Sequence, residues 1–80
     1  MPSKTGQTTL LDVRKNRNGR ITGLPEDASL RSQCIRLGLN VEAMFTCIER
    51  LPGGTVVVQS HRQEIALGRD LARSITVELL

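Results

Sequence analysis

Apolar residues recur along the chain with two different periods, and these periods predict most of its secondary structure. Leu30, Cys34 and Leu37 are separated by four and three positions, which places them on one face of a helix. Alternation of apolar and polar residues, which is typical of strands with one buried face, recurs in several other segments. The pattern therefore predicts one short helix, at about residues 28–37, and five short strands. We expect the strands at residues 20–24, 43–50, 55–60, 64–67 and 74–79.

The two ends of the predicted helix carry their own signals. At its start, Asp27 and Ser29 are each able to accept hydrogen bonds from the first free amides, and the sequence does not choose between them. At its end, Gly38 stands where a residue with positive φ closes many helices, and Leu39 stands where a Schellman motif has an apolar residue. We therefore expect Gly38 to determine the direction in which the chain leaves the helix.

Short polar segments predict the turns and complete the expected fold. Asn18-Gly19 predicts a tight turn before the first strand, and residues 61–63 predict the tip of a hairpin. Residues 8–13 form a first short apolar segment, and residues 1–7 are expected to be flexible. Five short strands and one helix indicate a mainly β fold, namely a small closed barrel, because closure removes exposed strand edges.

Composition and charge narrow the range of functions. The chain has 80 residues, enough for a single small domain over residues 1–80, and a formal net charge of +3. Phe45 is its one aromatic residue, so the chain lacks the set of rings on which single-stranded nucleic acids stack. The residues at its N-terminus predict no signal peptide, and nowhere do about 18 apolar residues run together. We therefore expect a cytoplasmic protein that does not insert into a membrane.

Residues able to support catalysis or bind metal are few and lie apart in the sequence. Cys34 and Cys47 form no CxxC motif, and His61 has no acidic or cysteine partner at ligand spacing. Core packing is the expected role of the two thiols, and a solvated turn is the expected place of the histidine. The chain has no nucleophile elbow and no phosphate-binding loop. We expect no enzyme activity, no metal site and no cofactor, while adventitious zinc or iron at these three side chains stays open.

Three segments carry a more specific signal when they are taken together. They are LRSQCIRLGL at residues 30–39, the segment 45–52, and ALGRDLA at 66–72 followed by ITVE at 75–78. In order and spacing they resemble the bacterial FeoA family (ferrous iron transport protein A), and the resemblance extends from Gly19 to the C-terminus. It implies an SH3-like β-barrel with one inserted helix. It also implies a small cytosolic accessory of FeoB, the membrane transporter that takes up ferrous iron and carries a cytosolic GTP-binding domain.

This resemblance makes docking on FeoB the leading hypothesis. The chain would support or regulate the GTP-dependent iron transport of FeoB as a non-enzymatic module that does not itself bind iron. We expect the partner to contact the helix and its exit, at Arg31, Arg36, Leu39 and Asn40. The residues expected to support this interface are Leu30, Leu37 and Gly38.

Two alternatives come from other features. The sequence pI of about 9.5 favours a small basic barrel that binds nucleic acid, although the lack of aromatic rings counts against it. The expected fold is also that of the SH3-like C-terminal module of iron-dependent repressors, which would make the chain a stand-alone regulatory domain acting on another protein. The sequence does not give the oligomeric state, so self-association stays open.

Overall fold

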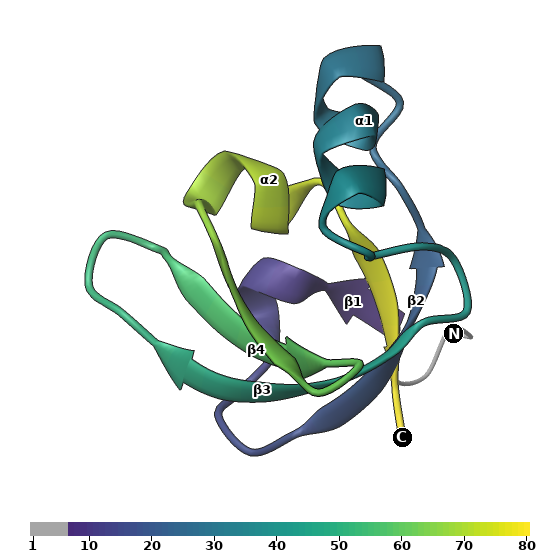
Figure 1. Cartoon of the computed structure of the whole chain (residues 1–80). Helices are drawn as coiled ribbons and strands as arrows, with labels where there is room; N and C mark the ends of the chain where they lie inside the picture. Colours follow the sequence, from purple (N-terminus) through teal and green to yellow (C-terminus); the bar gives the residue numbers. More distant parts are fainter. Residues whose placement is uncertain (1–6) are drawn as a thin grey trace, which may run out of the picture.

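The computed structural model describes residues 7–80, which form a six-stranded antiparallel sheet and three short helical segments (Figure 1). The fold is mainly β, as predicted, and the expected flexibility of residues 1–7 falls almost wholly outside the described residues. In chain order the elements are β1 (Gln7–Thr9), η1 (Leu10–Asp12), β2 (Asn18–Gly23), α1 (Ala28–Arg36), β3 (Met44–Arg50), β4 (Val56–Ser60), β5 (Gln63–Leu67), α2 (Arg69–Arg73) and β6 (Thr76–Leu79).

The strands follow the order β1-β6-β2-β3-β4-β5 across the sheet, and every neighbouring pair is antiparallel. The five predicted strands all form, and β1 is a sixth strand that the sequence pattern did not separate from the apolar segment 8–13. The sheet curls into an SH3-like barrel, but β1 and β5 remain edge strands, so the expectation of full closure is wrong. Strand β1 is followed by η1, and strand β5 is followed by α2. These two helical segments pack against each other, whereas β1 and β5 do not pair.

The core is formed by inward-facing side chains of the curled sheet together with residues of the helical segments and the connections beside them. Along β3, Phe45 and Cys47 are buried while Met44 is exposed and Thr46 is half-buried, which confirms the predicted alternation. The side chains without any exposed surface are those of Leu10, Val13, Ile21, Cys34, Leu39, Cys47, Val56, Val58, Leu67, Ala72, Ile75 and Val77. One of these, Leu39, comes from the segment that follows α1 rather than from the sheet.

The predicted turn at Asn18-Gly19 is wrong, because both residues lie inside β2. The chain reverses earlier, at Lys15 and Asn16, and Asn16 adopts a φ of 72°. Gly19 has a different role: a Cβ atom on it would lie 2.6 Å from Cζ of Phe45. A glycine at this position therefore leaves room for the buried aromatic ring.

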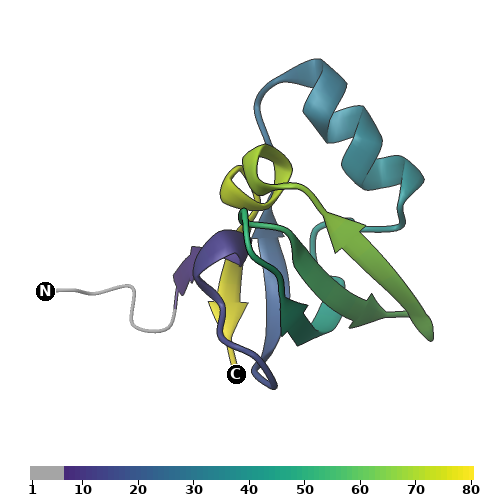
Figure 2. The ribbon, with the colours of Figure 1, turned by 90° about the vertical axis from the view of Figure 1, so that its left-hand side faces the viewer.

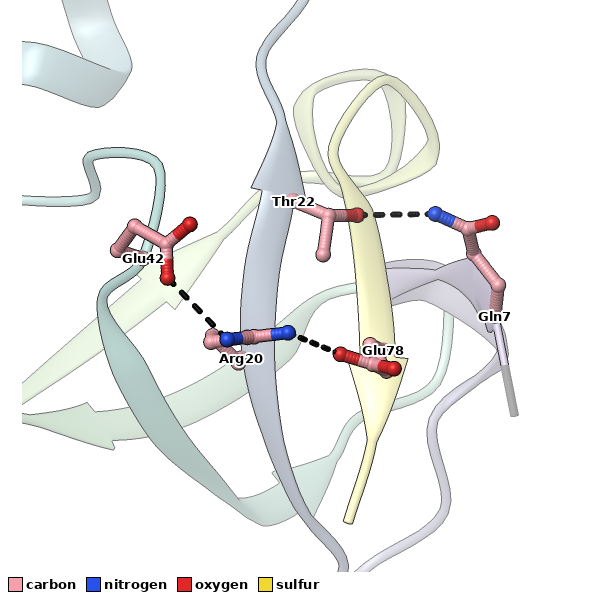
Figure 3. Close-up of polar contacts among 5 residues, drawn as sticks. All are labelled: Gln7, Arg20, Thr22, Glu42 and Glu78. Carbon is pink, nitrogen blue, oxygen red and sulfur yellow. Dashed lines mark hydrogen bonds and ion pairs between the residues drawn. The ribbon is translucent and has the colours of Figure 1, made fainter. Parts of the chain in front are cut away.

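The outer face of β2 and β6 carries a polar cluster that also involves the loop after α1 (Figure 3). The Arg20 guanidinium donates to Glu42 Oε1 at 3.2 Å and to a carboxylate oxygen of Glu78. Its hydrogen bond to Glu78, and the negative charge of Glu42 next to it, raise the pKa of Arg20. Gln7 Nε2 donates to Thr22 Oγ1 at 3.2 Å on the same face. Arg20 thus links the loop that leaves α1 to the middle of the sheet.

Candidate functional site

Helix α1 begins at a well-formed cap. Asp27 Oδ1 accepts hydrogen bonds from the backbone N–H of Ser29 at 2.8 Å and of Leu30 at 3.0 Å, which decides between the two capping residues left open by the sequence. Arg31 then reaches back, and its guanidinium donates to the carbonyl oxygens of Pro25 at 3.2 Å and of Glu26 at 3.1 Å. The proposed interface residue Arg31 is therefore already engaged in fixing the loop before the helix.

Helix α1 ends in a complete Schellman motif, as predicted. The backbone N–H of Leu39 donates to the carbonyl oxygen of Cys34 at 2.9 Å, and that of Gly38 donates to Ile35 at 3.0 Å. Gly38 has the expected positive φ, 85°. The motif turns Leu39 into the core, where no part of its side chain is exposed. The prediction that Leu39 contacts a partner is therefore wrong, because the Schellman motif turns the Leu39 side chain into the core.

The exposed residues at the helix exit are partly those expected and partly others. Arg36 and Asn40 are exposed, so both remain available to a partner. The apolar surface comes from Ile35, which is 53% exposed, and Val41, which is 46% exposed. The sequence carried a signal for Ile35, because it lies off the predicted buried face of the helix and yet is large and apolar.

A groove separates α1 from β5 and α2. Figure 2 shows α1 beside these two elements and apart from the rest of the sheet. The groove has a volume of about 510 Å³. Leu30 and Leu37, which were expected to support the interface, are half-buried, pack against the core and line one wall. Ala66 and Leu71 belong to the opposite wall, so the groove offers apolar side chains on both walls, beside polar and charged ones.

The charged residues of the groove are unequally neutralised. Asp70 accepts a hydrogen bond from Arg73 at 3.0 Å, and these two side chains form an ion pair. Arg69, which also lines the groove, has no ion-pair partner among residues 7–80, and the same holds for Arg36 on α1. Arg36 follows the groove residue Gln33 by three positions, so the two are neighbours on the helix surface. Arg69 and Arg36 are therefore the two cations at the groove without an ion-pair partner among residues 7–80.

The two cysteines behave as core residues, as predicted. Both thiols are free and buried, and desolvation raises the pKa of Cys34 and of Cys47 above the ordinary value for a thiol. Cys47 Sγ donates to the carbonyl oxygen of Val13 at 3.8 Å. His61 is exposed at the tip of the β4–β5 hairpin. Across residues 7–80, no three His, Cys, Asp or Glu side chains come together in a group able to hold a metal ion.

Comparison with known proteins decides the family. The model of the FeoA domain matches residues 8–79, a range that includes the sheet, α1 and the groove. The chain belongs to the FeoA family. This confirms the resemblance seen in the sequence and relates the chain to a family of iron-associated small domains. Search of curated protein sequences gave no match to this FeoA-family chain.

Solved structures share the fold of this FeoA-family chain at low sequence identity. A crystal structure described as an iron uptake regulatory protein (FeoA) has a TM-score of 0.86 and 20% identity, covering 92% of this chain and 99% of that one. A FeoA-like protein from Clostridium acetobutylicum has a TM-score of 0.84 and 18% identity, covering 95% and 90%. A manganese-dependent transcriptional repressor has a TM-score of 0.88 and 18% identity, covering 99% of this chain but 44% of the repressor. The SH3-like fold is thus shared by FeoA proteins and by part of metal-dependent repressors.

No helix within residues 7–80 is long and apolar enough to cross a membrane.

Proposed function

We propose that this FeoA-family chain is a non-catalytic accessory protein that docks on the cytosolic face of the FeoB transporter and supports or regulates its GTP-dependent uptake of ferrous iron. The observation that carries the proposal is the match of the FeoA domain over residues 8–79. The proposal places the protein in the cytoplasm, where the GTP-binding domain of the transporter lies. Both cysteine thiols are buried, and burial raises their pKa, which supports a role that does not require the chain to hold iron.

Helix α1 supplies the docking surface in this proposal. Most of its residues are exposed, and Cys34 is the one residue of the helix that is fully buried. Ile35 and Val41 give exposed apolar contact area at its exit, and Arg36 adds a charge that has no partner within residues 7–80. Apolar anchors bordered by an arginine are typical of protein–protein interfaces.

The likeness to metal-dependent repressors concerns the fold alone. The proposed function therefore rests on the family of the chain. A stand-alone regulatory domain would act on a different partner, and the neighbouring genes discriminate between the two proposals. A transporter gene beside this one supports docking on FeoB.

A binding measurement with charge-matched variants tests the proposal. The chain is immobilised, and the cytosolic domain of FeoB from the same genome is passed over it with no nucleotide, with GDP and with a GTP analogue. Ile35→Asp and Arg36→Glu should each weaken binding, and each should reduce iron uptake in a deletion strain. Arg14→Glu is the matched control, because Arg14 is exposed in the loop between η1 and β2, at the opposite end of the molecule from α1 (Figure 1). If the unaltered chain binds in none of the nucleotide states, the proposed function is wrong.

A further inference from the structure

Strand β5 has an open edge. It pairs with β4, from Val56 opposite Leu67 to Ser60 opposite Gln63, and it is the last strand in the order of the sheet. The two-residue loop between the strands has positive φ at both residues, 54° and 68°, which is the conformation of a type I′ turn. The pair that closes such a turn exchanges both backbone hydrogen bonds, and hydrogen-bonded pairs then alternate along the ladder.

This alternation tells which backbone groups of β5 face away from β4. Gln63, Ile65 and Leu67 belong to the hydrogen-bonded pairs, so the N–H and C=O groups of Glu64 and Ala66 point outward. Among residues 7–80, no backbone group outside the sheet pairs with either residue. Unpaired N–H and C=O groups along a strand edge form a template with which another extended chain can pair.

The groove beside α1 meets this open edge at Ala66. Ala66 and Gly68 line it from the side of β5, and Leu30 and Leu37 line it from the side of the helix. An extended segment lying there would pair its backbone with Glu64 and Ala66 and place alternate side chains against the leucines of α1. The groove therefore provides both parts of a strand-addition site, namely a backbone template and apolar contacts for specificity.

The charges around the groove select the kind of segment. Arg69 lines it, and Arg36 follows the lining residue Gln33 by one turn of α1; neither has an ion-pair partner in the described part of the chain, while Asp70 is paired with Arg73. Glu64 is the carboxylate that β5 itself contributes. A second copy of this chain would bring the same arginines and a net charge of +3 to the contact. Acidic side chains on the incoming segment complement these arginines, and a second copy does so less well.

We infer that the partner adds an extended, acidic segment to β5 as a further antiparallel or parallel strand, held in the groove between β5 and α1. The inference rests on the proposed function for the identity of the partner, which is the cytosolic part of the transporter. It adds the mode of recognition, in which main-chain hydrogen bonds at Glu64 and Ala66 add to the side-chain contacts made by α1. Helix α1 closes the other side of the groove over the added strand.

Amide hydrogen exchange followed by NMR tests the inference directly. The amides of Glu64 and Ala66 face outward and should exchange fast in the free protein, whereas that of Ile65 is protected by β4. On addition of the cytosolic domain of FeoB, exchange at Glu64 and Ala66 should slow roughly tenfold or more. If the domain binds and these two amides keep their rates, strand addition is wrong although the proposed function survives. If the two amides become protected with protein concentration alone, a second copy occupies the edge and the inference is also wrong.

A proline at the edge gives a second readout. Ala66→Pro removes an outward N–H that makes no hydrogen bond to β4, so the hairpin keeps its ladder while strand addition is blocked. We expect binding of the FeoB domain to weaken roughly tenfold or more. Ala66→Ser is the matched comparison, because it is similar in size and keeps the N–H, and it should bind more tightly than Ala66→Pro. Equal binding by both variants contradicts the inference.

Peptides remove the concern that a variant is misfolded. Overlapping peptides of about 12 residues, covering the cytosolic segments of FeoB, are screened to find the one that binds. That peptide is then made in two forms, with backbone N-methyl groups at the odd or at the even positions. Because a strand turns alternate N–H groups to the same side, one form should lose binding and the other should retain it. Equal loss or equal retention by the two forms, or the absence of any binding peptide when the intact domain binds, overturns strand addition.

Discussion

Replacement of Gly19 by alanine should destabilise the protein because of the aromatic ring that lies against it. The added Cβ would lie 2.6 Å from Cζ and 2.9 Å from Cε2 of Phe45, and 3.0 Å from the carbonyl oxygen of Glu78. Phe45 is 3% exposed, so its ring cannot move aside into solvent. Overpacking of this kind costs about 1–3 kcal/mol. The lower entropy of the unfolded alanine chain offsets about 0.5–1 kcal/mol of this cost.

The net loss for Gly19→Ala is therefore about 1–2 kcal/mol, and a domain of this size loses about 4–8 °C in Tm for each kcal/mol. Thermal and urea unfolding followed by circular dichroism measure it. Gly23→Ala in the same strand is the matched control: its Cβ would lie 3.4 Å from Cβ of Thr76, an ordinary contact, and the change should stabilise by about 0.5 kcal/mol.

A second substitution tests the cause of the effect. Phe45→Leu in the Gly19→Ala background removes the ring atoms that the new Cβ meets, so the two changes together should cost less than the sum of their separate costs. The reasoning is refuted if Gly19→Ala melts at or above the temperature of the unaltered protein, or if its effect is unchanged when Phe45 is replaced.

Three further predictions concern the helix and the buried thiols. Gly38→Ala should cost about 1 kcal/mol in urea unfolding, because the residue has a φ of 85°; an unchanged midpoint would contradict this. Asp27→Ala should cost about 1 kcal/mol through loss of the helix cap, whereas Ser29→Ala should change stability by less than about 0.5 kcal/mol; equal effects in thermal melts would argue against the capping role. Because burial raises the pKa of Cys34 and Cys47, their contribution to stability is complete below the ordinary thiol value of 9.0 and is lost as the pH rises above it. Urea unfolding at pH 8 and pH 10 should show this loss, and it should shrink in a variant with both cysteines replaced by alanine.

Sequence periodicity predicted the strands and the helix because the core of this fold is simple. The face of α1 formed by Leu30, Cys34 and Leu37 turns toward the rest of the domain as the spacing requires. The spacing of apolar residues shows which side chains are buried, and this spacing differs between a helix and a strand. The family resemblance then added what periodicity cannot provide, namely the SH3-like arrangement of the strands.

Other features could not be obtained from local patterns. Asn-Gly is a strong turn signal, but the need to seat the ring of Phe45 fixes Gly19 within a strand, and that contact joins residues far apart in the sequence. Leu39 was correctly placed in a Schellman motif and still assigned to the surface, because the sequence does not show which side of the helix end faces the core. The groove and the open edge of β5 depend on the order of strands in space, which no single segment encodes.

The anchoring of α1 has a mechanical consequence. Its exit is fixed, because Cys34 and Leu39 are both fully buried and are joined by a backbone hydrogen bond of 2.9 Å. Its beginning is held by the cap and by the contacts of Arg31 with the preceding loop, while Leu30 is only half-buried. The helix is therefore held by core packing at its exit and by hydrogen bonds at its beginning. The wall that α1 gives to the groove depends on buried side chains at the Leu37 end, and on the cap and the Arg31 contacts at the Leu30 end.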